Sequence, residues 1–222
     1  MKKILCLLLT LVLVFACVSC GKFGKDKGGD ESEGTVETIA ATVNSSNPTE
    51  IVTKVDYIAE GQETLTSSYV TEKDAENGIE RFVFHTQRYA DVEELVPDNI
   101  KKLDGTVWKN ADGSVKNSKG DVFSKNDAVG YVSEKLNVVK SAFKTYELKD
   151  GGNDLSATVE AKNAEIVFGT DIKAVGDISI EIDTNGIYLY NVSVSYTTET
   201  GAKVNITTSY GYAVVRITDA EQ

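Results

Sequence analysis

The last third of the chain alternates between apolar and polar residues. The pattern occupies three runs, 178–183, 188–196 and 204–212, with turn residues at Asn185-Gly186 and at Thr200-Gly201 between them. Successive side chains of a strand point to opposite faces of a sheet, and Asn-Gly is a favoured hairpin turn because both residues tolerate positive φ. The sequence therefore predicts three antiparallel strands that share one apolar, tyrosine-rich face and one polar face.

A second group of strand-like runs lies in the first half of the chain. These runs are separated by Gly61 and by the turn at 74–78, and they cover Thr49 to Ile58, Glu63 to Thr71 and Gly78 to Gln87. They predict a meander of three antiparallel strands. Residues 90–125 are less regular and predict a helical turn at Asp91 to Leu95 and short strands at Gly105 to Lys109 and at Asp121 to Ser124.

A long helix is predicted between the two groups of strands. Ser124 or Asn126 can cap its start, and one stripe at helical spacing follows, formed by Ala128, Val132, Leu136, Val139 and Phe143. A second, shorter helix is predicted from Ala161 to Phe168, ending at Gly169, although the same residues could pair as a strand.

Together these elements predict an α+β fold: a curved, half-barrel-like antiparallel sheet packed against one long helix and a second short one. The predicted domain covers residues 48–222. It follows a segment, 20–47, that is rich in Gly, Lys, Asp, Glu, Ser and Thr. Because that composition buries too little apolar surface to offset the entropy of ordering, we expect a flexible acidic, glycine-rich linker there.

The N-terminus has the pattern of an export signal. Lys2 and Lys3 precede an apolar run from Ile4 to Val18, and Ser19-Cys20-Gly21 follows. The run is shorter than the roughly 20 residues that a membrane-spanning helix needs. Its ending resembles the lipobox of bacterial lipoproteins, in which the cysteine after the cleavage site is diacylated and becomes the first residue. The resemblance implies a signal peptide over 1–19 and a diacylglyceryl anchor on Cys20.

Cys17 is the alternative lipidation site. The bulky Phe15 precedes Cys17 where a small or β-branched residue is usual, whereas the small Ser19 and the glycine at position 21 flank Cys20, so we favour Cys20. An uncleaved N-terminal membrane helix is the other alternative. Because two or more acyl chains give lasting attachment, the lipobox reading places the protein on the extracytoplasmic face of the cell membrane, in the cell envelope.

Charge and cysteine content narrow the function further. The chain has 23 basic and 34 acidic residues and a formal net charge of −11. Such a chain repels nucleic acid and anionic headgroups, so no nucleic-acid partner is expected. No cysteine follows Cys20, which excludes disulfides and cysteine metal sites from the domain.

The sequence offers little for catalysis or cofactor binding. His85 is the single histidine, and no Gly-x-Ser-x-Gly motif accompanies it, so we expect no catalytic residues, no cofactor and no metal site, and hence no enzyme. Acidic pairs at Glu93-Glu94 and at Asp150 and Asp154 could bind calcium, but a solvated acidic surface explains them equally.

The order of strands, helix and strands from Thr49 to Ile217 resembles the LolA and LppX family of bacterial lipoprotein carriers and lipid-binding lipoproteins. The resemblance implies a sheet that closes over helices around an apolar cavity and binds acyl chains or another lipoprotein. The residues that would line this cavity are Tyr188, Tyr190, Tyr196, Tyr210 and Tyr212. Tyrosine suits a cavity wall whose hydroxyl must find a partner, and it suits the edge of an ordinary core equally well.

Two hypotheses follow. In the first, the chain is a non-enzymatic, lipid-anchored lipoprotein that binds an apolar ligand or a lipoprotein in a tyrosine-lined cavity of the sheet. In the second, the domain has a solid core and works as an interaction or structural lipoprotein that joins a complex of the envelope. The first predicts an interior cavity, and the second predicts an exposed apolar patch or an unpaired edge strand.

Overall fold

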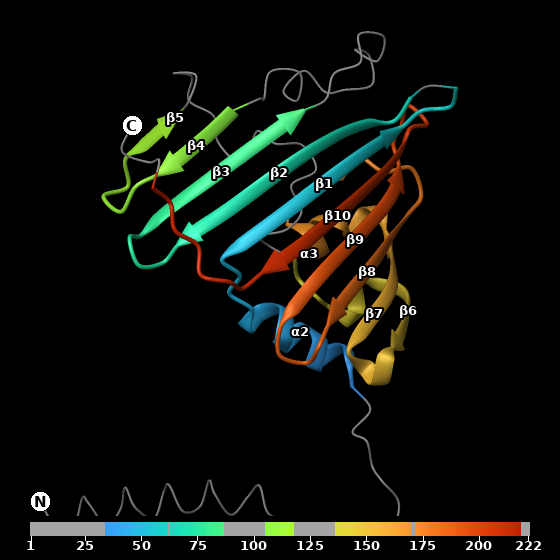
Figure 1. Ribbon diagram of the computed structural model, residues 1–222. Coiled ribbons are helices and arrows are strands. Elements are labelled where there is room, and N and C mark those ends of the chain that lie inside the picture. The colour runs from blue at the N-terminus through green and yellow to red at the C-terminus, as the bar shows by residue number, and fades with distance from the viewer. Residues whose placement is uncertain (1–33, 62, 87–104, 118–135, 170–171, 219–222) are drawn as a thin grey trace, which may run out of the picture. The chain divides into compact units, whose positions relative to one another are not determined.

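The fold is dominated by one large, open antiparallel sheet. The computed structural model describes residues 34–61, 63–86, 105–117, 136–169 and 172–218, all within the compact unit Glu33–Gln222. The sheet has ten strands in the order β5-β4-β3-β2-β1-β10-β9-β8-β7-β6 and is visibly curved (Figure 1). The α+β class and the curved antiparallel sheet predicted from the sequence are confirmed.

The strands fall into an N-terminal and a C-terminal meander. The first contains β1 (Glu50–Ile58), β2 (Leu65–Asp74), β3 (Ile79–Thr86), β4 (Gly105–Lys109) and β5 (Val115–Asn117). The second contains β6 (Phe143–Lys149), β7 (Asp154–Glu160), β8 (Asp177–Thr184), β9 (Leu189–Thr197) and β10 (Lys203–Gly211). Pairing of β1 with β10 along its whole length, from Glu50 opposite Gly211 to Ile58 opposite Lys203, joins the two meanders into one sheet.

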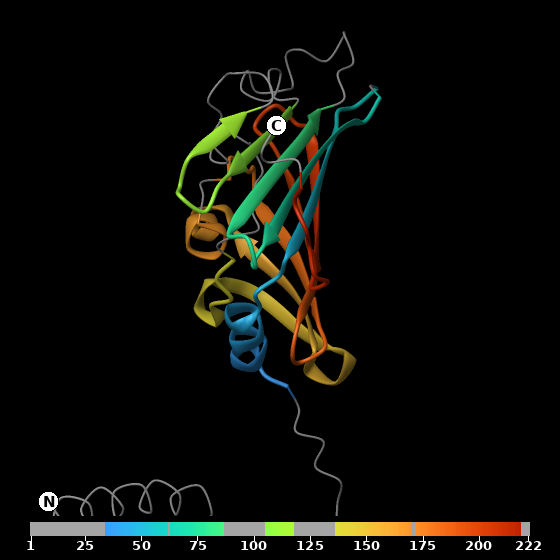
Figure 2. The same cartoon turned by 60° about the vertical axis from the view of Figure 1, so that its left-hand side comes forward.

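Two short α-helices accompany the sheet. The first, α2, spans Val36–Ser45 and begins at a capping box in which the side chains of Thr35 and Thr38 each bond the other's backbone amide. The second, α3, spans Ala164–Phe168 after a 3₁₀ turn (Ala161–Asn163) and ends at Gly169, whose φ of 65° is the left-handed conformation that glycine adopts without strain. Both helices lie on the same side of the sheet (Figure 2). In the part of the chain described, no helix is long and apolar enough to cross a membrane.

Of the two helices predicted from the sequence, the short one at 161–168 is confirmed and the long one is not. Most of the predicted long helix lies outside the described residues, and its described end, 136–143, is not α-helical. Lys140–Ala142 is a 3₁₀ turn, and Phe143 begins β6. The physical reason is that residue 137 bonds to α3 instead of to its own turn: the backbone N–H of Asn137 donates to the carbonyl of Val167 at 2.7 Å.

Helix α2 lies within the segment 20–47 where the composition predicts a linker, so that prediction is wrong for residues 36–45. Val36, Ile39 and Thr42 lie on one face of α2, and all three are buried. The Thr42 hydroxyl donates to the Gly186 carbonyl at 3.2 Å, and the Ser46 hydroxyl accepts the Leu189 N–H at 3.0 Å. These contacts fix α2 at the β8–β9 turn and give it the tertiary partners that the composition did not reveal.

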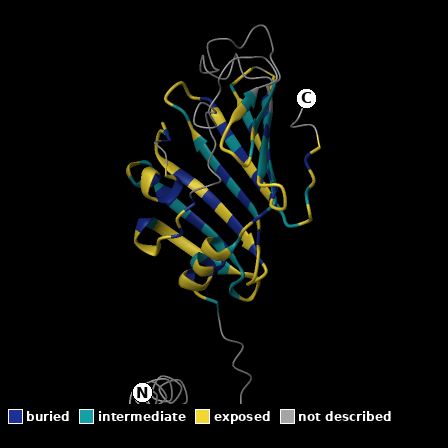
Figure 3. Cartoon of the chain, turned by 90° about the vertical axis from the view of Figure 1, so that its left-hand side faces the viewer, coloured by how far each residue is buried: buried dark blue, intermediate teal, exposed yellow. Residues whose placement is uncertain are grey.

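The core is the buried face of the sheet, on which alternate residues of each strand lie. On β7, β8 and β9 nearly all of these residues are aliphatic, Thr184 at the end of β8 being polar: Leu155, Ala157, Val159, Ile178, Ile180, Ile182, Val192 and Val194. Buried residues of both helices and of 136–142 join the same core (Figure 3). Cross-strand partners such as Ile180 and Val194 are opposite each other in the β8–β9 pair, so their side chains lie side by side on the buried face.

Candidate functional site

The buried face changes character where it crosses β10, β1 and β2. There many of the alternate positions carry hydroxyl side chains among aliphatic ones such as Val55 and Ile206. The hydroxyl-bearing residues, none more than 7% exposed, we call the hydroxyl face: Thr53, Tyr57, Ser67, Tyr69, Thr71, Thr208 and Tyr210. They come together because the register aligns the three strands: Thr53 is opposite Thr208 on one side and Tyr69 on the other. The hydroxyl face is thus a continuous surface three strands wide.

Part of the hydroxyl face is satisfied internally and part is not. The hydroxyls of Thr53 and Thr208 bond each other at 3.1 Å, fully buried. The hydroxyls of Tyr57, Ser67 and Tyr69 have no hydrogen-bond partner, although these residues are 5%, 0% and 1% exposed. Buried polar groups are nearly always hydrogen-bonded, so three such hydroxyls on adjacent strands need an explanation.

The hydroxyl face carries no charge at neutral pH. Burial raises the pKa of Tyr57, and the nearby Tyr196 and Tyr69 raise it further. Burial also raises the pKa of Tyr69 to about 12, and it raises the pKa of Tyr196. Desolvation disfavours the phenolate form, so these phenols stay neutral hydrogen-bonding groups.

The structure brings Tyr196 and Tyr210, two of the tyrosines predicted from the sequence, to this part of the core. Val204 separates Tyr196 from Tyr57 in one cross-strand row, being opposite Tyr196 on β9 and opposite Tyr57 on β1. Tyr210 is opposite Ile51 and is 7% exposed.

Tyr188 and Tyr190 do not lie on the buried face, contrary to the prediction; they are 44% and 42% exposed. The cause is a register shift in the β8–β9 pair: Asp183 is opposite Asn191, but Thr184 is opposite Leu189. Tyr190 is thereby left outside the pairing, and Leu189, only 4% exposed, takes the buried position.

Tyr212 is half-buried at the edge of the core. Its ring lies against that of Tyr188, with centroids 4.6 Å apart, and its hydroxyl donates to the Leu189 carbonyl at 2.8 Å. These contacts place Tyr212 where it supports the β8–β9 turn, away from the unpartnered hydroxyls.

Tyr57, Ser67 and Tyr69 were not among the candidate residues from the sequence. A signal was present, because all three lie in runs predicted as strands and alternate with polar residues such as Asp56 and Ser68. What the sequence could not show is that their hydroxyls would be buried without a partner.

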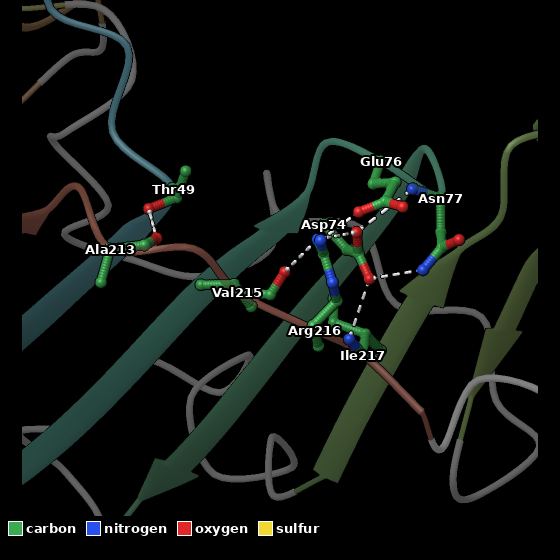
Figure 4. A network of polar contacts seen from close by, with 8 residues as sticks. All are labelled: Thr49, Asp74, Glu76, Asn77, Ala213, Val215, Arg216 and Ile217. Atoms are coloured by element: carbon green, nitrogen blue, oxygen red, sulfur yellow. Dashed lines mark hydrogen bonds and ion pairs between the residues drawn. The ribbon is translucent and has the colours of Figure 1, made fainter.

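A second buried polar cluster lies where the C-terminal tail meets the β2–β3 turn (Figure 4). The Asp74 side chain, fully buried, accepts from the backbone N–H of Ile217 at 3.0 Å and from the side chain of Asn77 at 2.8 Å. Arg216 pairs with Asp74 at 3.4 Å and also with Glu76. All hydrogen-bonding groups here find partners, so this cluster fastens the tail to the sheet.

The candidate metal and catalytic residues contribute no site in the described part of the chain. No group of three or more His, Cys, Asp or Glu residues that could hold a metal ion occurs there. Glu93 and Glu94 lie outside the described residues, as does the side chain of His85. Asp154 caps a strand end by accepting from the Thr184 N–H at 3.2 Å.

No protein-family model and no curated protein sequence matches the chain. Among solved structures, the chain is similar to a LolA superfamily protein from Nitrosomonas europaea, with a TM-score of 0.33 and 7% sequence identity over 82% of this chain and 95% of that one.

Proposed function

We propose that this protein is a non-enzymatic, lipid-anchored lipoprotein of the extracytoplasmic membrane face that binds an apolar molecule against the curved sheet. The observation that carries the proposal is the hydroxyl face, where buried aromatic rings adjoin hydroxyls that have no partner. A core that serves packing alone favours side chains without unsatisfied polar atoms, as on β7, β8 and β9. A binding surface needs the mixture found here: apolar area with a few polar groups.

The hydrogen bonds of the two described helices are made away from the hydroxyl face. Helix α2 contacts β7 and the β8–β9 turn. Helix α3 packs with 136–142, where the backbone N–H of Asn137 donates to the Val167 carbonyl at 2.7 Å. Among the described residues, the hydrogen bonds of both helices thus go to the C-terminal half of the sheet or to segments next to it.

The location of the protein is proposed from the N-terminus. Lys2 and Lys3, the apolar run and Ser19-Cys20 favour export and lipidation at Cys20. The acidic domain would then stand away from the anionic membrane surface while its ligand arrives from the bilayer or from another lipoprotein.

Native mass spectrometry with lipid extraction tests the proposed function. The chain should be expressed from Gly21 onward, so that α2 is retained, and purified without detergent. We expect an apolar species to co-purify in stoichiometric amount and to be released by organic solvent. An unrelated acidic protein purified in parallel controls for carry-over.

A clean mass without bound lipid, together with no uptake of an apolar fluorescent probe, would contradict the proposed function. It would favour the second candidate, an interaction module. That candidate draws on the exposed apolar residues at the β8–β9 turn, Ile187, Tyr188 and Tyr190, which are 65%, 44% and 42% exposed.

A further inference from the structure

We propose that the hydroxyls of Tyr57, Ser67 and Tyr69 form a subsite for an uncharged, oxygen-bearing group of the ligand, such as an ester or a hydroxyl. The ligand is then an amphiphile with a neutral polar group, not a pure hydrocarbon and not an anion. This inference rests on the proposed function and specifies its ligand class.

The first argument is the contrast between hydroxyls on the same surface. Thr53 and Thr208 show that a buried pair on these strands can satisfy itself, since their hydroxyls bond each other at 3.1 Å. The hydroxyls of Tyr57, Ser67 and Tyr69 do not, although they lie on the same strand or on the adjacent one. Leaving buried donors unpaired is costly, and a ligand oxygen that accepts from them removes that cost.

The second argument is that the described residues offer no buried cation to pair with an anionic group of a ligand. In the described part of the chain, Asp74 is the one buried residue that carries a charge. Its carboxylate already accepts from Ile217 and Asn77 and pairs with Arg216. Among the described residues, a carboxylate or phosphate placed against the hydroxyl face would therefore find no buried cation to offset its desolvation. An ester carbonyl or a hydroxyl needs only the hydrogen bonds that these groups offer.

The third argument is the apolar surface beside the hydroxyls. The Tyr69 ring stacks with that of Phe82, with centroids 6.2 Å apart and the planes 9° from parallel. Leu65, two residues before Ser67 on the same face of β2, is 1% exposed. Hydrocarbon next to the polar group of the ligand would thus meet aromatic and aliphatic side chains.

Binding assays with three probes test the subsite. The mature chain is loaded with the neutral fluorophore N-phenyl-1-naphthylamine, which is then displaced by 1,2-dioleoylglycerol, oleate or squalene. We expect dioleoylglycerol to bind the wild type more tightly than the other two. Tyr57→Phe, Tyr69→Phe and Ser67→Ala should each weaken dioleoylglycerol binding about five- to tenfold and leave squalene binding unchanged.

Tyr188→Phe is the matched control, because it removes the same atom from an exposed tyrosine, and it should bind all three probes like the wild type. Thermal unfolding of the ligand-free variants gives a second readout. Tyr57→Phe and Tyr69→Phe should melt at or above the wild-type temperature, because neither loses a hydrogen bond in the free protein. Three separate variants keep the test open if one of them fails to fold.

The outcomes separate the subsite from the proposed function. If the wild type binds squalene and dioleoylglycerol alike and the variants do not discriminate, the subsite is wrong and the apolar binding function stands. If oleate binds best, the uncharged ligand class is wrong. If the wild type binds none of the probes, both proposals fail.

Discussion

Asp74 shows how one residue can tie two distant segments together. It lies at the end of β2, yet its carboxylate accepts the backbone N–H of Ile217, more than 140 positions away in sequence. The bonds from Ile217 and from Asn77, followed by the charge of Arg216, lower the pKa of Asp74 to about 2 from its usual 3.8. Because these bonds favour the ionised form, Asp74 stabilises the folded state only while it is charged.

Acid should therefore weaken the attachment of the tail. A carboxyl whose pKa is lowered by folding contributes stability above its unfolded pKa, and the contribution disappears as the pH falls through the folded value. We expect the free energy of unfolding to decrease between about pH 4 and pH 2 and this decrease to be smaller in Asp74→Asn, which should also be less stable than the wild type at pH 7. Urea unfolding at a series of pH values measures both effects.

Asp183→Asn is the control with the opposite sign. Desolvation, followed by the charges of Asp154 and Glu181, raises the pKa of Asp183. A raised carboxyl pKa means that the ionised form is less favourable in the folded protein, so the Asn variant should be as stable as the wild type at pH 7 or more stable. Equal losses in the two variants at pH 7 would contradict this account of Asp74.

At the scale of elements, some strands follow from the local sequence pattern and others do not. The alternation at 178–183 and 204–212 predicted β8 and β10 to within a residue or two, because one face of each strand is buried and the other is not. The strands β5, β6 and β7 were missed. β6 lies at the edge of the sheet, and the four consecutive residues Lys144–Glu147 are all exposed. The strand therefore has little alternation to detect.

Helix α2 depends on tertiary contact. A ten-residue helix is marginal in isolation, and this one draws its stability from burying Val36 and Ile39. The chain enters α2 at Gly34, whose backbone packs so closely against Gly152 that neither position has room for a Cβ. The helix therefore belongs to the folded unit and not to the linker.

Ile39→Ala tests whether α2 is part of the core. Ile39 is 1% exposed, so the substitution should lower the free energy of unfolding by about 2–4 kcal/mol through lost burial and a cavity. Ile187→Ala makes the same change at a side chain that is 65% exposed and should cost about 0.5 kcal/mol or less. Similar costs at both positions, measured by urea unfolding, would show that α2 does not pack as described.

At the scale of the whole molecule, surface charge and buried face differ. The formal net charge is −11, yet the hydroxyl face holds none of that charge. Under the proposed function, the acidic residues would keep the domain away from anionic headgroups, while the buried face would offer rings and hydroxyls to an apolar ligand.

Lipidation is the prediction that belongs to this scale. Cys20→Ser should abolish incorporation of labelled palmitate and release the protein from the membrane fraction, because no other residue would carry the acyl chains. Cys17→Ser should leave labelling and fractionation unchanged. Loss of labelling in Cys17→Ser, with retention in Cys20→Ser, would move the lipidation site to Cys17.

The sequence by itself determined the features that depend on neighbouring residues. These are the alternation of six of the ten strands, the turn at Asn185-Gly186 and the short helix ending at Gly169. Each follows from a period or a motif within about twenty residues, so one chain is enough to detect it.

Tertiary structure alone decided the features that depend on pairing between distant segments. The β1–β10 pairing assembles the hydroxyl face, the register shift at Leu189 exposes Tyr190, and the α2 contacts order a stretch whose composition resembles a linker. The physical reason is that burial and hydrogen bonding are properties of surroundings. Tyr57 and Tyr188 are the same residue in similar local patterns, yet the first is buried without a partner and the second is exposed to solvent.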